Sequence, residues 1–128
     1  MTNLGHVSEL TPIQVWEGVV ARRVEGEQLT VAVVELEPNA VVPEHVHPNE
    51  QCGLVIEGNI TFRIGDEERS FGPGGTWRIL SNVPHTVVTG PDGAVLVDVF
   101  APPRADWADR PTVGTDAEPA VPVWPRSV

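Results

Sequence analysis

The chain has 128 residues, the size of one ordinary domain, and 41% of them are hydrophobic, which is enough to build a core. Its 18 acidic and 8 basic residues give a formal net charge of −10. This charge repels phosphate groups, so we expect neither nucleic acid nor a membrane surface as a partner. No stretch approaches the roughly 20 apolar residues of a membrane helix. The absence of lysine and tyrosine excludes Schiff-base chemistry, a P-loop lysine and a tyrosine acid.

The cysteine content and the first residues of the chain indicate the cellular compartment. Cys52 is the only cysteine, so no disulfide can form within the chain. No charged and then apolar leader precedes the first strand-like segment. We therefore expect a cytoplasmic protein.

The apolar residues predict an all-β fold. They run in short alternating or β-branched stretches, and no window of a dozen residues has helical spacing. Turns rich in glycine, proline and asparagine separate the stretches. In chain order the expected strands are residues 13–23, 28–37, 51–56, 59–64, 67–71, 76–80, 85–89 and 94–101. Eight short strands spaced in this way are typical of a barrel or sandwich.

The composition changes from Pro102 onward, where six of the 13 prolines occur. We expect residues 1–104 to form the domain, including its N-terminal strand, and residues 105–128 to form a proline-rich arm. The arm either lies on the domain or on a neighbouring subunit, anchored by Trp107 and Trp124, or lacks order.

Three of the four histidines lie in two short segments, and their spacing predicts a metal site. On an extended strand, side chains two residues apart project from the same face, so His45 and His47 can present their imidazoles to one point. His85 begins a later predicted strand, behind a turn of glycines and proline, and this returning strand can bring it to the pair. Imidazole is a common ligand of divalent zinc, iron, nickel, copper and manganese.

Two neighbouring residues are candidates for an oxygen ligand. On a regular strand Gln51 shares the parity of His45 and His47, whereas Glu50 faces the opposite side. A bulge at Pro48 would shift that parity. We favour Gln51 and keep Glu50 as the alternative.

Two charged residues near the last predicted strand are candidates for catalysis. Asp98 interrupts an apolar strand and shares a face with Phe100, and a buried carboxylate can serve in proton transfer. The alternative is a structural pair with an arginine or an outward position at an edge. Arg104 can hold a substrate carboxylate through two parallel hydrogen bonds, or it can be a solvated surface residue.

The histidine segments resemble the two motifs of the cupin family. Residues 43–58, PEHVHPNEQCGLVIEG, are similar to the first motif, and residues 71–85, FGPGGTWRILSNVPH, are similar to the second. The resemblance covers residues 31–104. It implies a single-domain, jelly-roll barrel of two packed antiparallel sheets that holds one divalent transition metal ion per chain, namely zinc, nickel, iron or manganese. The metal ligands it implies are His45, His47, Gln51 and His85, with Gln51 standing where many cupins have glutamate.

Within the cupins, the motif around Gln51 and the ending DVFAPPR at residues 98–104 resemble the KdgF-like pectin-degradation group. This resemblance implies that Asp98 and Arg104 take part in catalysis and that Phe100 and Arg104 contact the substrate. The substrate would be a small, carboxylated, oxygen-rich molecule. The implied reaction is the conversion of a 4,5-unsaturated uronate to its linear keto form by proton transfer and ring opening.

Other functions and an assembly state also follow from the family resemblance. Cupins with a glutamine ligand include dioxygenases and proteins similar to polyketide cyclases or hydroxynitrile lyases. A further alternative, from a different class, is a module that binds a sugar acid or a metal without turnover. Small cupins commonly pair through spare terminal segments, so we expect a homodimer.

Overall fold

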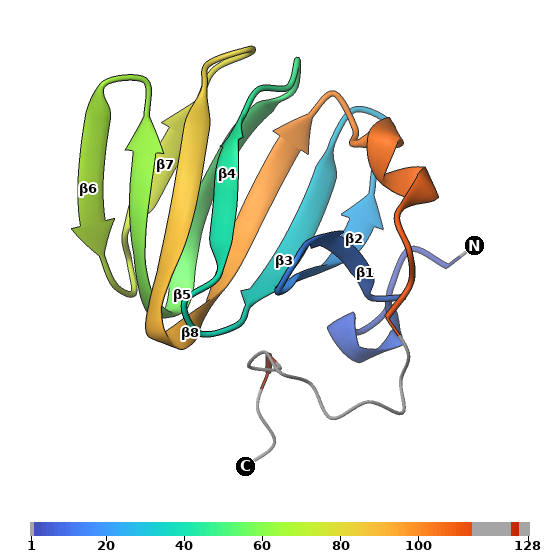
Figure 1. Ribbon diagram of the computed structural model, residues 1–128. Helices are drawn as coiled ribbons and strands as arrows, with labels where there is room; N and C mark the ends of the chain where they lie inside the picture. The colour runs from blue at the N-terminus through green and yellow to red at the C-terminus, as the bar shows by residue number, and fades with distance from the viewer. Residues whose placement is uncertain (1, 114–123, 126–128) are drawn as a thin grey trace.

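The computed structural model describes residues 2–113 and 124–125, and their regular structure consists of β-strands and two short 3-10 helices (Figure 1). This confirms the all-β prediction. The elements in chain order are η1 (Val7–Glu9), β1 (Ile13–Trp16), β2 (Val19–Glu25), β3 (Thr30–Leu36), β4 (Val41–His45), β5 (Glu50–Ile64), β6 (Glu67–Phe71), β7 (Thr76–Ile79), β8 (His85–Ala101) and η2 (Ala105–Asp109). Neither helix in this part of the chain is long and apolar enough to cross a bilayer.

The two long strands β5 and β8 pair antiparallel along almost their whole length and form the centre of the sheet. Strands β3, β2 and β1 extend the sheet on the far side of β8, while β6 and β7 pair with the two halves of β5 and β4 pairs with the start of β8. Register shifts interrupt the β5–β8 ladder between Val55 and Ile60. Because such bulges bend strands, the hydrogen-bonded sheet curls into a barrel of two facing layers (Figure 1).

Alternation along the strands separates an inner face from an outer one. On β3 the side chains of Ala32, Val34 and Leu36 are buried in the core, and Leu36 is only 1% exposed. Burial of one such aliphatic side chain contributes about 2 kcal/mol. Further from Leu36 the same inner face also carries polar residues, among them Gln51 and Asp98, and Asp98 pairs with Ala32 in the strand register. These polar side chains therefore point into the molecule and not into solvent.

The strand boundaries differ from the predicted ones in four places. The first predicted strand is two strands, β1 and β2, because Gly18 turns the chain with a φ of +74°. The predicted breaks at residues 57–58 and 90–93 lie inside β5 and β8, where Gly58 pairs with Ala94. Strand β4 was not predicted. Glycine at position 58 marks a close approach of two backbones, since a Cβ there would collide with the carbonyl oxygen of Gly93.

The first part of the proline-rich arm packs on the domain. Helix η2 places Trp107 in the core at 4% exposure, and Arg23 Nη1 donates a hydrogen bond to the Trp107 carbonyl oxygen at 3.1 Å. Thr112 then forms a β-bridge with Ile13. Contact with the domain thus continues past Arg104, where the predicted arm begins. The rest of the predicted arm, residues 114–123 and 126–128, lies outside the described residues.

Candidate active site

Three histidines meet at one end of the barrel. His45 ends β4, His47 follows two residues later, and His85 begins β8 directly opposite His45 in the strand register. Their potential ligand atoms all lie within 4.8 Å of one another. The ring centroids of His45 and His85 are 4.2 Å apart, and those of His47 and His85 are 4.8 Å apart. The two segments singled out in the sequence thus supply one cluster.

Backbone carbonyls fix the tautomer of each ring. A carbonyl oxygen only accepts hydrogen bonds, so the Nδ1 atom facing it carries the proton, and in a neutral ring Nε2 keeps a free lone pair. The partners are the Pro43 carbonyl for His45, the Asn49 carbonyl for His47 and the Val83 carbonyl for His85, at N···O distances of 2.8, 2.9 and 2.9 Å. All three rings are therefore prepared to bind a cation through Nε2.

Burial keeps these rings neutral. Desolvation lowers the pKa of each of the three histidines, and it lowers that of His85 to about 4. The positive charge of Arg104 acts in the same direction on all three. Nε2 of His85 is buried and has no hydrogen-bond partner in the part of the chain that the structure describes. A buried lone pair without a donor is costly in a protein interior unless a cation or a water molecule satisfies it.

Gln51 supplies a fourth donor atom beside the histidines. Its Nε2 donates a hydrogen bond to Asp98 Oδ1 at 2.9 Å, which orients the amide and turns Oε1 toward His47. Oε1 lies 3.1 Å from His47 Nε2, so two lone pairs face each other. Since neither atom can donate to the other, the pair suits a cation between them. Glu50, the alternative ligand, is exposed on the outer side of the strand.

The four side chains fit a divalent transition metal ion. Three neutral imidazole nitrogens and one amide oxygen form the mixed nitrogen and oxygen set that zinc, iron, nickel and manganese accept. Each imidazole has the second hydrogen bond that typically orients a metal-binding histidine. The structure thus holds a possible metal site, and its donor set is common to several metals.

Asp98 lies behind Gln51 on the inner face of β8 and is 4% exposed. Besides the Gln51 amide, its Oδ1 accepts a hydrogen bond from Trp77 Nε1 at 2.7 Å. Burial raises the pKa of Asp98 to about 6, against the opposing effect of these two hydrogen bonds and of the Arg104 charge. Within the described part of the chain no arginine forms an ion pair with Asp98, so the structural pair considered from the sequence is absent.

Arg104 follows β8 and is 8% exposed, so it is not a solvated surface arginine. Its Cζ atom lies 4.7 Å from the centroid of the Phe100 ring and 4.5 Å from that of Trp107. Its Nε and Nη2 atoms donate to the two carboxylate oxygens of Asp106 at 3.0 and 2.9 Å. Phe100 also faces the histidines, with its centroid 5.9 Å from that of His47.

One cavity joins these groups. Its volume is about 60 Å³, and its lining includes His45, Gln51, His85, Asp98, Phe100 and Arg104. This is room for a few water molecules and is well below the several hundred cubic ångströms of typical ligand pockets. The arrangement combines metal-binding atoms, a buried carboxylate and a guanidinium around one small space.

Comparison with known proteins identifies the family. The family model of the cupin domain matches residues 32–100, more than half of the chain. The chain belongs to the cupin family. The pectin degradation protein KdgF of Dickeya dadantii (strain 3937) is 30% identical to this cupin over 82 residues, which are 63% of this chain and 74% of that protein. The predicted membership in the KdgF-like cupins is thus confirmed.

Solved structures show the same fold. The structure of KdgF from Halomonas sp. matches this cupin with a TM-score of 0.75 at 23% identity, covering 83% of this chain and 98% of that one. An RmlC-like cupin from Shewanella frigidimarina NCIMB 400 matches with a TM-score of 0.76 at 20% identity, covering 83% and 96%. The single-domain cupin barrel predicted from the two motifs is therefore the observed fold.

Several residues of this cupin's site carried no functional signal in the sequence. The sequence pattern does not distinguish Trp16 and Trp77 from core residues. Trp16 nevertheless lies in the cavity wall, with its ring centroid 5.0 Å from that of His45, and Trp77 donates a hydrogen bond to Asp98. For Trp107 the sequence predicts only that it anchors the proline-rich arm. Asp106 had no signal at all, because nothing in a Pro-Pro-Arg-Ala-Asp segment indicates which way its side chains point.

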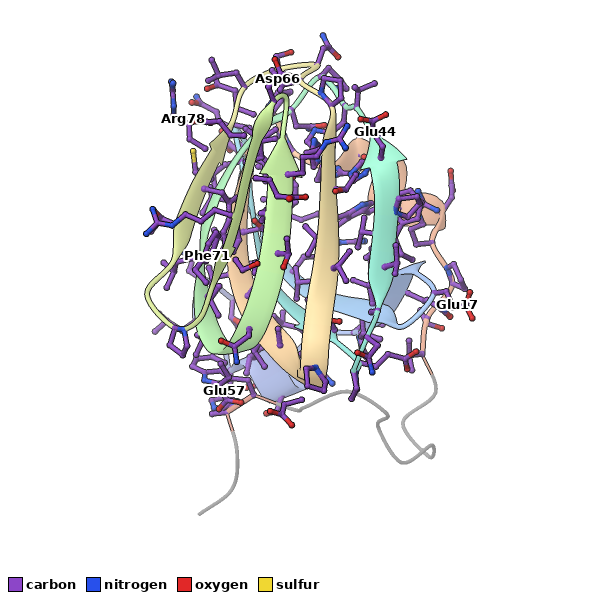
Figure 2. The ribbon with its side chains drawn as sticks, turned by 60° about the vertical axis from the view of Figure 1, so that its left-hand side comes forward. Glu17, Glu44, Glu57, Asp66, Phe71 and Arg78 are labelled. Carbon is purple, nitrogen blue, oxygen red and sulfur yellow. The ribbon has the colours of Figure 1, made fainter. Side chains whose placement is uncertain are left out.

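Two strand arginines lie away from the cavity of this cupin. Arg63 on β5 contacts Glu44 at 3.4 Å, and both side chains are more than half exposed. Glu44, at the end of β4, and Arg78, on β7, lie on the outside of the barrel (Figure 2). Arg104 is therefore the guanidinium that lines the histidine cavity.

Proposed function

We propose that this cupin is a metal-dependent enzyme that converts a 4,5-unsaturated uronate to its linear keto acid. The observation that carries the proposal is the convergence of a possible metal site, a buried carboxylate and a buried guanidinium on one cavity. The similarity to a pectin degradation protein supports an unsaturated sugar acid as the class of substrate.

His45, His47, His85 and Gln51 would hold the metal ion, which when bound supplies Lewis-acid polarisation of substrate oxygen atoms. Arg104 would bind the substrate carboxylate through paired hydrogen bonds. These two anchors act on different oxygen atoms of one small molecule. Together they would orient the sugar ring beside Asp98.

Asp98 would move the proton that ring opening requires. The hydroxyl of the hemiacetal carbon loses a proton, its C–O bond becomes a carbonyl, and the bond from that carbon to the ring oxygen breaks. The ring oxygen then forms a ketone as the double bond takes up one proton at the carbon remote from the carboxylate. One proton leaves and one is added, so the reaction is an isomerisation that needs no oxidant. Asp98 is supported in this role by its place in the cavity wall and by the lack of an ion-pair partner among the described residues.

The cavity is open to solvent on one side, and a uronate larger than its 60 Å³ would extend into that opening. Trp16 lies in the cavity wall at the end of β1, which pairs only with β2 among the strands, and this pairing is irregular between Gln14 and Trp16. Movement of Trp16 away from His45 would expose the histidine cluster.

The test combines metal analysis with an ultraviolet assay on the same sample. About one metal ion per chain, together with faster loss of the conjugated double bond than in buffer, would support the proposal. A chelator-treated sample that recovers activity on adding back the metal is the control. Metal content of about one ion per chain without turnover would refute the uronate reaction.

A second function is the binding of a small sugar acid without turnover, since a guanidinium and a possible metal site in one cavity are enough to hold such a ligand. In this case Asp98→Ala would retain ligand affinity, and neither the wild type nor the variant would form a product. Oxygen uptake with such an acid would instead indicate a dioxygenase.

A further inference from the structure

Asp106 is joined to Arg104 by two hydrogen bonds that use one whole edge of the guanidinium. Nε donates to Oδ1 at 3.0 Å and Nη2 donates to Oδ2 at 2.9 Å. The pKa of Asp106 is lowered, mainly by this hydrogen bonding. Asp106 belongs to η2 and its side chain is 53% exposed, whereas that of Arg104 is only 9% exposed. The carboxylate thus reaches from the surface to a buried cation.

Two aromatic rings hold the plane of the same guanidinium. Phe100 and Trp107 lie 4.7 and 4.5 Å from its Cζ atom, and the two rings contact each other with their centroids 5.1 Å apart. Arginine has many rotamers and loses much conformational freedom when it is fixed. Here the rings restrict tilting of the plane and the paired hydrogen bonds restrict rotation within it.

The other edge of Arg104 keeps its donors. A guanidinium has five N–H groups, of which Asp106 takes one from Nε and one from Nη2. Two N–H groups on Nη1 and one on Nη2 remain, and Nη1 has no partner among the described residues. Arg104 lines the histidine cavity, and its charge lowers the pKa of Asp98 and of the three histidines. The remaining donors are enough for a second carboxylate.

We propose that Asp106 is a positioning residue that holds Arg104 so that its free edge selects ligands carrying a carboxylate. The inference rests on the proposed function only in taking the ligand to be a small sugar acid. Holding one flexible side chain in its binding orientation improves affinity by a factor of roughly two to ten.

The test measures binding of D-galacturonate to the zinc-loaded full-length protein by nuclear magnetic resonance titration, with D-galactose as the ligand without a carboxylate. Asp106→Asn removes the charge and one of the two acceptor oxygens. We expect it to weaken galacturonate binding about 5-fold to 10-fold and to leave galactose binding unchanged. Asp106→Glu keeps the carboxylate and should restore affinity to within about threefold of the wild type.

Asp109→Asn is the matched control, because it removes the same charge from the same helix and Asp109 is exposed. Its galacturonate affinity should equal that of the wild type. The Nε–H resonance of Arg104 gives a readout independent of any ligand, since it should shift in Asp106→Asn and not in Asp109→Asn. Thermal melting of each variant shows that the barrel is folded.

The outcomes separate this inference from the proposed function. Tighter galacturonate binding by Asp106→Asn would show that Asp106 competes with the ligand, and this would overturn the proposal. Unchanged affinity in Asp106→Asn would also overturn it. So would a wild type that does not prefer galacturonate to galactose. If the wild type binds galacturonate as expected but does not open unsaturated uronates, the proposed function fails and the role of Asp106 stands. If it does open them, Asp106→Asn should raise KM by a similar factor with little change in kcat.

Discussion

Gly53 makes room for the hydrogen bonds of Asp98, and its replacement tests whether that arrangement matters. Gly53 lies on β5 directly opposite Asp98 on β8. A Cβ atom at this position would lie 2.6 Å from Asp98 Oδ1 and 2.7 Å from Trp77 Cζ2, and it would also collide with the Val97 carbonyl oxygen. All three separations, including the one from the Val97 oxygen, are shorter than a van der Waals contact. Gly53→Ala therefore has to displace the carboxylate, the indole or the strand.

The expected cost follows from overpacking of a well-packed interior, which is about 1–3 kcal/mol for added methyl groups. For a domain of this size, this lowers the melting temperature by roughly 3–15 °C. Displacement of Asp98 also releases the Gln51 amide, whose orientation depends on that carboxylate. A misplacement of about 1 Å at a reacting group can cost 100-fold in rate, so activity should fall at least tenfold.

The assay is thermal melting by circular dichroism, with metal content and turnover measured on the same sample. Metal content should fall less than activity, because the three histidines keep their own backbone hydrogen bonds while the Gln51 amide loses its partner. Gly5→Ala is the control, since a Cβ there meets no atom of residues 2–113 or 124–125 within 4 Å. A Gly53→Ala protein with wild-type melting temperature and activity would refute the argument that Asp98 needs this space.

Three further predictions concern the metal site, the carboxylate site and the barrel. His47→Ala should lose most of the bound metal ion and the activity while circular dichroism shows a folded barrel; full metal retention would contradict the ligand assignment. Arg104→Lys should raise KM for a carboxylated substrate at least about tenfold, because one ammonium group cannot form two parallel hydrogen bonds to Asp106 and two more to a substrate carboxylate. Unchanged kinetics would show that Arg104 does not bind the substrate. Arg22→Leu should destabilise the protein by about 3–5 kcal/mol in urea unfolding, because it leaves the fully buried carboxylate of Glu35 without its ion-pair partner. The double variant Arg22→Leu, Glu35→Leu should regain most of this loss, and additive losses would contradict the explanation.

The histidine cluster was predictable because its signal is local. His45 and His47 are two residues apart, so extended backbone alone directs both imidazoles to one side. The glycines and prolines around His85 indicated a returning strand. Parity along a regular strand also favours Gln51 over Glu50. In the structure residues 46–49 are not a strand, yet Gln51 faces His47 while Glu50 is exposed.

The strand boundaries were less predictable, since a glycine has the same local signal in a turn and in a bulge. The sequence predicts a break at Gly58, yet β5 continues through it. What keeps the strand together is its pairing with Ala94, which is 36 residues further along the chain. Local sequence carries no information about such a partner.

The sequence by itself determined the all-β class, the cupin motifs and the side chains that can bind a metal, since these depend on residue type and on spacing within a few residues. Only the tertiary structure decided what surrounds Asp98 and Arg104. Asp98 receives its hydrogen bonds from β5 and β7, and Arg104 is buried because η2 folds back over it with Trp107. These contacts depend on the register between distant strands and on the packing of the chain after β8, and both arise from the burial of the whole core and not from any local pattern.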